Sequence, residues 1–165
     1  MRQLSFNMYQ SCAIIFIWSI TFKEKQMNTI MKVFKDKRLK LTPQRIAVYE
    51  YLLDTREHPS AEVIYTSLQE KFPTMSLATV YKSLKTLVEV NLITEINLGE
   101  GNFRYDSTIA DHPHIQCIHC SKVEDIMDVP MTMINREIVK YTDYKVLTSK
   151  LYFYGICNKC KIQES

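Results

Sequence analysis

Glycine and proline are scarce in this sequence, with three Gly and five Pro among 165 residues. Long flexible linkers are therefore excluded, and connections between structural units must be short. The sequence also has no internal repeat and no low-complexity tract. It offers no glycine-rich nucleotide-binding loop and no obvious nucleophile–base pair. These absences argue against a repeat protein and against an enzyme.

Long hydrophobic runs are missing as well. The longest candidate, from Cys12 to Phe22, has eleven residues, whereas a helix that spans a bilayer needs about 20. No small-x-small cleavage site follows this run, and Met27 and Met31 are alternative starts. We therefore interpret residues 1–26 as an N-terminal extension of doubtful origin. A cytoplasmic protein with no membrane partner is expected.

The remaining composition is that of a folded protein, with 46% hydrophobic and 24% charged residues. The net charge is only +3, but six basic residues and one acid fall between Met27 and Arg45. Such a concentration fits either contact with nucleic acid or a solvated basic helix face.

Three helices and a hairpin are predicted in the first half. One helix begins at Thr42-Pro43, a second follows Ser60, is lined by Val63, Ile64, Leu68 and Phe72, and ends at Pro73, and a third is capped by Ser76. Strands are expected at 92–96 and 103–106 around a turn at 99–102. Together they predict a winged helix-turn-helix over residues 27–107.

The third helix would enter the major groove of double-stranded DNA. Its outward side chains and one residue of the first helix are the candidate DNA contacts: Arg45, Thr79, Tyr81, Lys82 and Lys85. Lysine suits phosphate or guanine, and a tyrosine ring can pack on a thymine methyl group. A winged helix that contacts another protein is the alternative.

The pattern changes after Asp106, and a hinge is expected at 108–114. Short strands are predicted between 115 and 129, a helix after Pro130, and β-forming residues from 144 to 156. The fold class is therefore α+β, with a small C-terminal domain at 115–165. Because about fifty residues make a weak core, this domain needs a metal or a dimer partner.

Four of the five cysteines form two CxxC pairs, Cys117 with Cys120 and Cys157 with Cys160. Four thiolates suit one tetrahedral zinc ion. The long gap between the pairs places them on separate elements, after the first and the last strand of the domain. Two disulfides or a redox CxxC are the alternatives, although the βαβ context of thioredoxin-type motifs is absent. His119 is a spare ligand or a surface residue.

Three of the four histidines lie between 112 and 119. His112 and His114 share one side of an extended chain, with Asp106, Asp111 and Asp125 near them in sequence. Nitrogen and oxygen ligands suit iron(II), manganese(II) or zinc. From spacing alone, either a second metal site or a polar hinge explains this cluster.

Six motifs together resemble the ferric uptake regulator (Fur) family: LTPQR (41–45), HPSAEVIY (58–65), FPTMSLATVYKSL (72–84), RYD (104–106), HPHIQCIHC (112–120) and YGICNKC (154–160). The resemblance runs from about Met27 to Cys160. It is strongest to the peroxide-sensing branch, because aspartate stands at both carboxylate positions and Leu147-Thr148-Ser149-Lys150 has no extra histidine.

The resemblance implies a homodimeric repressor that binds a two-fold symmetric operator. It implies structural Zn²⁺ on the four cysteines and regulatory Fe²⁺ or Mn²⁺ on five residues: His58, Asp106, His112, His114 and Asp125. In this branch, peroxide oxidises a histidine ligand, which corresponds to His58 or His112, and repression ends. An iron or zinc homeostasis repressor of the same family and, more remotely, a zinc- or thiol-dependent enzyme are the alternatives.

Overall fold

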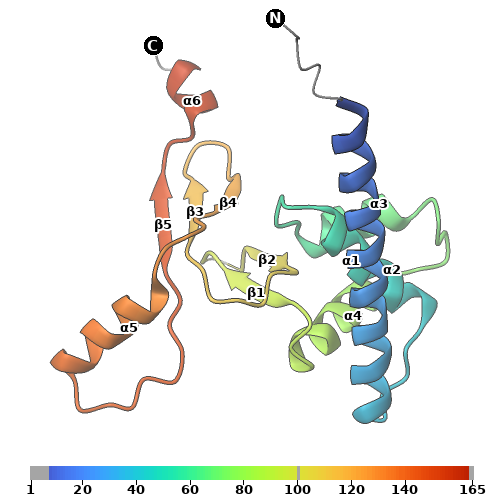
Figure 1. Ribbon diagram of the computed structural model, residues 1–165, viewed down its shortest axis with the longest axis horizontal. Helices are drawn as coiled ribbons and strands as arrows, with labels where there is room; N and C mark the ends of the chain where they lie inside the picture. The colour runs from blue at the N-terminus through green and yellow to red at the C-terminus, as the bar shows by residue number, and fades with distance from the viewer. Residues whose placement is uncertain (1–7, 100, 164–165) are drawn as a thin grey trace, which may run out of the picture. The chain divides into compact units, whose positions relative to one another are not determined.

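The computed structural model describes residues 8–99 and 101–163, and the chain divides into two compact units between residues 43 and 44. The first contains one long helix, α1 (Met8–Asp36), which sequence analysis did not predict and which continues past residue 26 (Figure 1). It ends where Arg38 adopts a positive φ of 55° and the Leu39 N–H bonds the Phe34 carbonyl. Residues 1–7 of the expected extension lie outside the described residues. None of the described helices combines the length and apolarity needed to cross a bilayer.

The second unit begins with three helices and a hairpin, as predicted: α2 (Pro43–Asp54), α3 (Ala61–Leu68), α4 (Leu77–Glu89), β1 (Thr94–Asn97) and β2 (Phe103–Asp106). The Ser60 and Ser76 side chains cap α3 and α4 by accepting the N–H groups of Val63 and Thr79. Each cap satisfies a backbone donor that the first turn leaves open.

Helix α4 ends in a Schellman motif around Asn91, whose φ is 57°. The Leu92 N–H reaches the Leu87 carbonyl at 3.0 Å, and the Asn91 N–H reaches the Val88 carbonyl at 2.9 Å. Leu92 belongs to this C-terminal cap, and Ile93 follows it before the first paired residue. Pairing in the hairpin therefore begins at Thr94, two residues after the predicted start at residue 92.

The prediction for α3 was wrong at its end and on one face. The helix ends at Leu68 rather than at Pro73, and turns occupy the intervening residues. Proline lacks an N–H and disfavours a helical residue before it. Val63, expected to line the core, is 45% exposed, because the buried stripe of this short helix consists of Ala61, Ile64 and Leu68.

The C-terminal part of the second unit holds a three-stranded sheet ordered β4-β3-β5, with β3 (His114–Cys117) in the centre (Figure 1). Strand β4 (Val123–Asp125) is antiparallel to β3, and β5 (Tyr152–Gly155) is parallel to it. The connection from β4 to β5 carries α5 (Met131–Ile138) and a 3₁₀ turn, η1 (Val139–Tyr141). Helix α6 (Asn158–Gln163) follows β5. These elements confirm the predicted α+β class.

The β-forming residues predicted over 144–156 form a strand only near the end of that segment. Only Tyr152–Gly155 pairs with β3, while Tyr144 and Leu147 are more than 80% exposed. Strand-forming residues make a strand only where a neighbour accepts their backbone bonds. Between the hairpin and the sheet, Ile96, Leu98 and Val123 form a small buried core with Tyr152 against it.

Candidate metal centres

His58 stands between α2 and α3 in a left-handed conformation with a φ of 49°, which costs energy for a residue other than glycine. The next residue fixes its place, because the Pro59 carbonyl accepts the Tyr105 N–H of β2 at 3.1 Å. Asp106 follows Tyr105 at the end of that strand. The bond therefore brings His58 beside Asp106.

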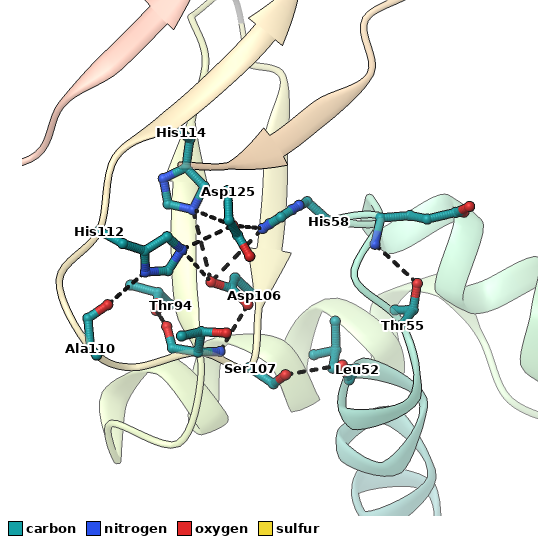
Figure 2. Close-up of polar contacts among 12 residues, drawn as sticks. Leu52, Thr55, His58, Thr94, Asp106, Ser107, Ala110, His112, His114 and Asp125 are labelled. Atoms are coloured by element: carbon teal, nitrogen blue, oxygen red, sulfur yellow. Dashed lines mark hydrogen bonds and ion pairs between the residues drawn. The ribbon is translucent and has the colours of Figure 1, made fainter. Parts of the chain in front are cut away.

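The other three residues belong to the hinge and the β3–β4 pair. His114 begins β3 and lies opposite Asp125, the last residue of β4. The Ile126 N–H donates to the Pro113 carbonyl at 2.8 Å, which extends this pairing past the strand end. His112 approaches Asp125 from the hinge side of the same strand (Figure 2).

These five side chains point at one another (Figure 2), and we call them the sensory cluster after the role that the family resemblance implies for them. One ligand atom from each lies within 4.8 Å of all the others. From the Asp125 Oδ1 atom, the Nε2 atoms of His58, His112 and His114 lie at 2.7, 2.9 and 3.5 Å. From the Asp106 Oδ2 atom, the same three nitrogens lie at 3.9, 3.3 and 3.8 Å. Ligand atoms that share one ion at about 2.0–2.2 Å are roughly 3–4 Å apart.

The chemistry of these atoms also fits a cation. The His112 Nδ1 atom lies 2.7 Å from the Ala110 carbonyl oxygen. It must therefore donate, and in a neutral ring the Nε2 lone pair faces Asp125. The Nε2 atoms of His58 and His114 and the Asp106 Oδ2 atom are buried without a hydrogen bond of acceptable geometry to any described residue. Facing acceptors repel unless a proton or a metal ion lies between them.

Charge inside the cluster shifts two pKa values. Burial would lower the pKa of His112, but the Ala110 carbonyl and Asp125 outweigh it and raise that pKa above its ordinary value. Burial would raise the pKa of Asp106, yet the neighbouring His114 imidazole, the hydrogen bond that the Thr108 N–H donates to the Oδ1 atom, and the nearby His58 and His112 lower it. Both shifts favour charged forms, as expected for a cluster of opposite charges.

The four cysteines form a second group, the cysteine cluster. Their sulfur atoms all lie within 4.8 Å of one another, and the Sγ atoms of Cys120 and Cys157 are 3.7 Å apart. A tetrahedral zinc ion with Zn–S bonds of about 2.3 Å requires sulfur atoms about 3.8 Å apart. All four are free thiols in the structure. His119 is exposed and lies outside this cluster.

Two chain turns create the cysteine cluster. Cys117 ends β3, and Ser121 turns the chain back into β4 with a φ of 59°. Cys157 follows β5 beside it, because Cys117 pairs with Gly155. The Cys157 N–H donates to the Cys117 sulfur at 3.4 Å, and this bond and another from the Cys120 N–H lower the Cys117 pKa to about 6. A thiolate that backbone donors stabilise is ready to bind a metal.

The predicted DNA contacts are exposed with two exceptions. Tyr81, Lys82 and Lys85 project from α4, whereas Thr79 and Arg45 are half-buried. The Tyr81 hydroxyl donates a short hydrogen bond to the Glu62 carboxylate of α3. Sequence analysis missed Glu62, and no local pattern could have found it, because this contact joins two helices.

The matching family model is that of the ferric uptake regulator family, over residues 36–154. The chain belongs to this family. The PerR transcriptional regulator of Clostridium acetobutylicum is 62% identical over 135 residues, covering 82% of this chain and 98% of the relative. The peroxide operon regulator of Bacillus subtilis is 34% identical over 140 residues, covering 85% and 97%.

A solved structure supports the fold. The Helicobacter pylori ferric uptake regulator, described as having three functional metal-binding sites, matches with a TM-score of 0.74 and 27% identity, covering 86% of this chain and 95% of that chain. Together with the curated relatives, this likeness identifies the chain as a metal-dependent, peroxide-responsive transcriptional repressor of the Fur family. It is not an enzyme.

Proposed function

We propose that the sensory cluster binds Fe²⁺ or Mn²⁺ and that the metal-loaded chain represses transcription until peroxide oxidises a histidine ligand. The observation that supports this most directly is the set of buried, facing acceptor atoms around Asp106 and Asp125. Imidazole and carboxylate ligands suit both ions.

The cluster can link metal binding to DNA binding, because its residues come from distant segments. His58 and Asp106 belong to the predicted DNA-binding domain, 27–107. Asp125 belongs to the predicted dimerisation domain, 115–165, and His112 and His114 stand in or beside the hinge, 108–114. A ligand favours one arrangement of these parts only by binding that arrangement more tightly. Loss of one ligand would therefore release it.

Iron(II), when bound, would supply the redox chemistry that cleaves the O–O bond of hydrogen peroxide; overall, one oxygen atom would be added to the imidazole of a histidine ligand, which is oxidised, and the other would leave as water. The residues of the chain would hold the ion and shield it from solvent. Asp106 and Asp125 keep negative charge toward the ion, and the Ala110 carbonyl holds the Nδ1 proton of His112 so that its Nε2 atom faces the centre. His58 and His112 are the residues proposed to be oxidised.

The cysteine cluster is proposed to hold structural Zn²⁺. The sulfur spacing of 3.7 Å supports this assignment. It would join the end of β3 to the segment after β5 within a small sheet. We also propose that residues 115–165 form a homodimer, which the exposed apolar side chains of Tyr141, Tyr144 and Leu147 support.

We propose that the homodimer binds a two-fold symmetric DNA operator through α4. Lys82 and Lys85 would contact phosphate or guanine, and Tyr81 would contact a base edge. Thr79 and Arg45 would support the same surface from half-buried positions.

The decisive experiment compares the iron-loaded and manganese-loaded protein on one operator fragment before and after hydrogen peroxide. Peroxide should abolish DNA binding by the iron form and spare the manganese form. Mass spectrometry should then find one added oxygen atom on the peptide that carries His58 or His112. Equal resistance of both forms would instead indicate an iron or zinc homeostasis repressor.

A further inference from the structure

The sensory cluster is shielded from solvent. The side chain of His58 is 2% exposed, those of His112 and His114 are each 9% exposed, and Asp106 is 8% exposed. A reactant of any size must therefore enter through an opening in the surrounding residues.

One cavity reaches two of these ligands. It lies between β1, the hinge and the segment that enters β5, and His112 and His114 form part of its wall. We name it the hinge cavity. About 30 Å³ of its space is open to a water-sized molecule, and one water needs roughly 10–15 Å³ by this measure. This space therefore has room for a molecule with two oxygen atoms, whereas a branched alkyl peroxide would have to remain in the part of the cavity that is open to solvent.

Hydrogen bonds hold the walls of the hinge cavity. The Thr94 hydroxyl donates to the Thr108 carbonyl at 3.0 Å, joining β1 to the hinge. The Lys150 ammonium donates to the Glu95 carbonyl at 3.0 Å, joining the opposite wall to the same strand. The Ala110 carbonyl accepts a hydrogen bond from the Nδ1 atom of His112, which joins this part of the wall to a proposed metal ligand. The cavity is therefore a fixed feature of the fold rather than a gap between loose loops.

We propose that the hinge cavity is the entry and binding site for hydrogen peroxide, and that its size selects this small neutral oxidant over bulky hydroperoxides. This inference rests on the proposed peroxide response of the sensory cluster. Ile109, which is 62% exposed, lies in the wall of the cavity, and the size of its side chain sets the width of the opening. It is neither a proposed metal ligand nor a hydrogen-bond partner of one.

The test uses full-length protein loaded with iron and bound to operator DNA. Ile109→Trp, which narrows the cavity, should slow release by hydrogen peroxide by at least about tenfold, the effect of roughly 1.4 kcal/mol on a barrier. Ile109→Ala, which widens the cavity, should leave the rate with hydrogen peroxide unchanged or increase it, and should speed release by tert-butyl hydroperoxide. Thr132→Trp places the same bulky side chain at an exposed position of α5 outside the cavity and should change neither rate.

Two controls separate access from damage to the site. Metal affinity and the DNA affinity of the manganese form should stay unchanged in all three variants. In the metal-free protein, deuterium exchange at the His112 C2 position, measured by mass spectrometry, should slow in Ile109→Trp and not in Thr132→Trp. This readout needs neither metal nor peroxide.

The outcomes distinguish the two proposals. A wild-type protein that ignores hydrogen peroxide contradicts the proposed function, while slower exchange at His112 would still support the cavity as a solvent path. If the wild type is sensitive to peroxide, but Ile109→Trp and Ile109→Ala have the same release rates and the same His112 exchange as the wild type, the inference alone is overturned.

Discussion

The Nε2 atom of His58 lies 2.7 Å from the Oδ1 atom of Asp125, although one residue follows α2 and the other ends β4. This contact crosses the predicted boundary between the DNA-binding and dimerisation domains. Asp125→Asn should lower the affinity for Mn²⁺ by at least about 10–100-fold. Substituting a residue that only hydrogen-bonds to a metal ligand already lowers metal affinity by that much, and Asp125 is itself a proposed ligand. Isothermal titration would measure this loss.

Glu124→Gln is the matched control for that substitution. Glu124 lies next to Asp125 in β4, but it is exposed and pairs with Lys122 at 2.7 Å outside the sensory cluster. Its replacement should leave metal affinity within about twofold, as expected for a solvent-exposed pair. An equal loss in both variants would mean that net charge, rather than ligation, sets the affinity.

Cys157→Ser should release zinc and disrupt the C-terminal sheet and the dimer. The sulfur of Cys157 belongs to the cysteine cluster, and its backbone N–H supports the Cys117 sulfur. Zinc content, sedimentation and circular dichroism would measure the effect. His119→Ala, an exposed change inside the first CxxC pair, should keep both zinc and dimer. A folded, dimeric Cys157→Ser protein would contradict the structural role.

The Glu62–Tyr81 contact predicts a pH dependence. The hydrogen bond from Tyr81, followed by one from Ser60, lowers the pKa of Glu62 below its ordinary 4.5. Because the pKa of Glu62 is lower in the folded than in the unfolded protein, its ionised form adds to the free energy of unfolding at pH values above 4.5. This contribution is lost as the pH falls through the pKa of the folded protein. Wild type should therefore exceed Glu62→Gln in stability above pH 4.5 and lose that advantage in more acid solution. Urea unfolding across pH measures this, with Tyr81→Phe as the partner in a double-mutant cycle.

Ser76→Ala should cost about 1 kcal/mol, the usual effect of losing an N-cap. The Ser76 hydroxyl accepts the Thr79 N–H at 3.2 Å at the start of α4. Thermal unfolding would report the change. Thr66→Ala, at an exposed position within α3 where the hydroxyl donates to the Glu62 carbonyl of the same helix, is the comparison and should cost less. Equal losses of stability in the two variants would show that the Ser76 cap contributes no more than an ordinary hydroxyl group on a helix.

Lys82 and Lys85 should contribute to DNA affinity mainly through charge. Each substitution to alanine should reduce the slope of log affinity against log salt by about one. Fluorescence anisotropy over a salt series would measure it. An unchanged slope would place these side chains away from the phosphates.

Local signals in the sequence predicted most of the winged helix and the elements around the cysteines. The start of each helix depends on a residue that acts on the backbone next to it: Pro43 for α2, Ser60 for α3 and Ser76 for α4. These helix starts could therefore be predicted without knowing the tertiary structure. The strand at 152–155 could not be delimited, because residues 144–151 have the same composition and only pairing with β3 separates them. The approach of His58 to Asp125 depends on the Pro59–Tyr105 and Pro113–Ile126 bonds, which no sequence period reveals. Spacing alone left a metal site among Asp106, His112, His114 and Asp125 as one of two explanations, and only the family resemblance implied that His58 joins them.

The parallel pairing of β3 and β5 has a consequence for the chain between them. Cys120 and Cys157 are 37 positions apart, and a zinc ion on both turns would close that segment into a loop. By the chain-entropy estimate for a cross-link, such closure lowers the conformational entropy of the unfolded chain and thereby raises its free energy by about 3–4 kcal/mol. The restraint holds the two ends of the loop and leaves its interior unconstrained. Insertions into exposed turns of this loop that leave the proposed dimer surface and Lys150 in place should therefore be tolerated, while β3 and β5 stay in register.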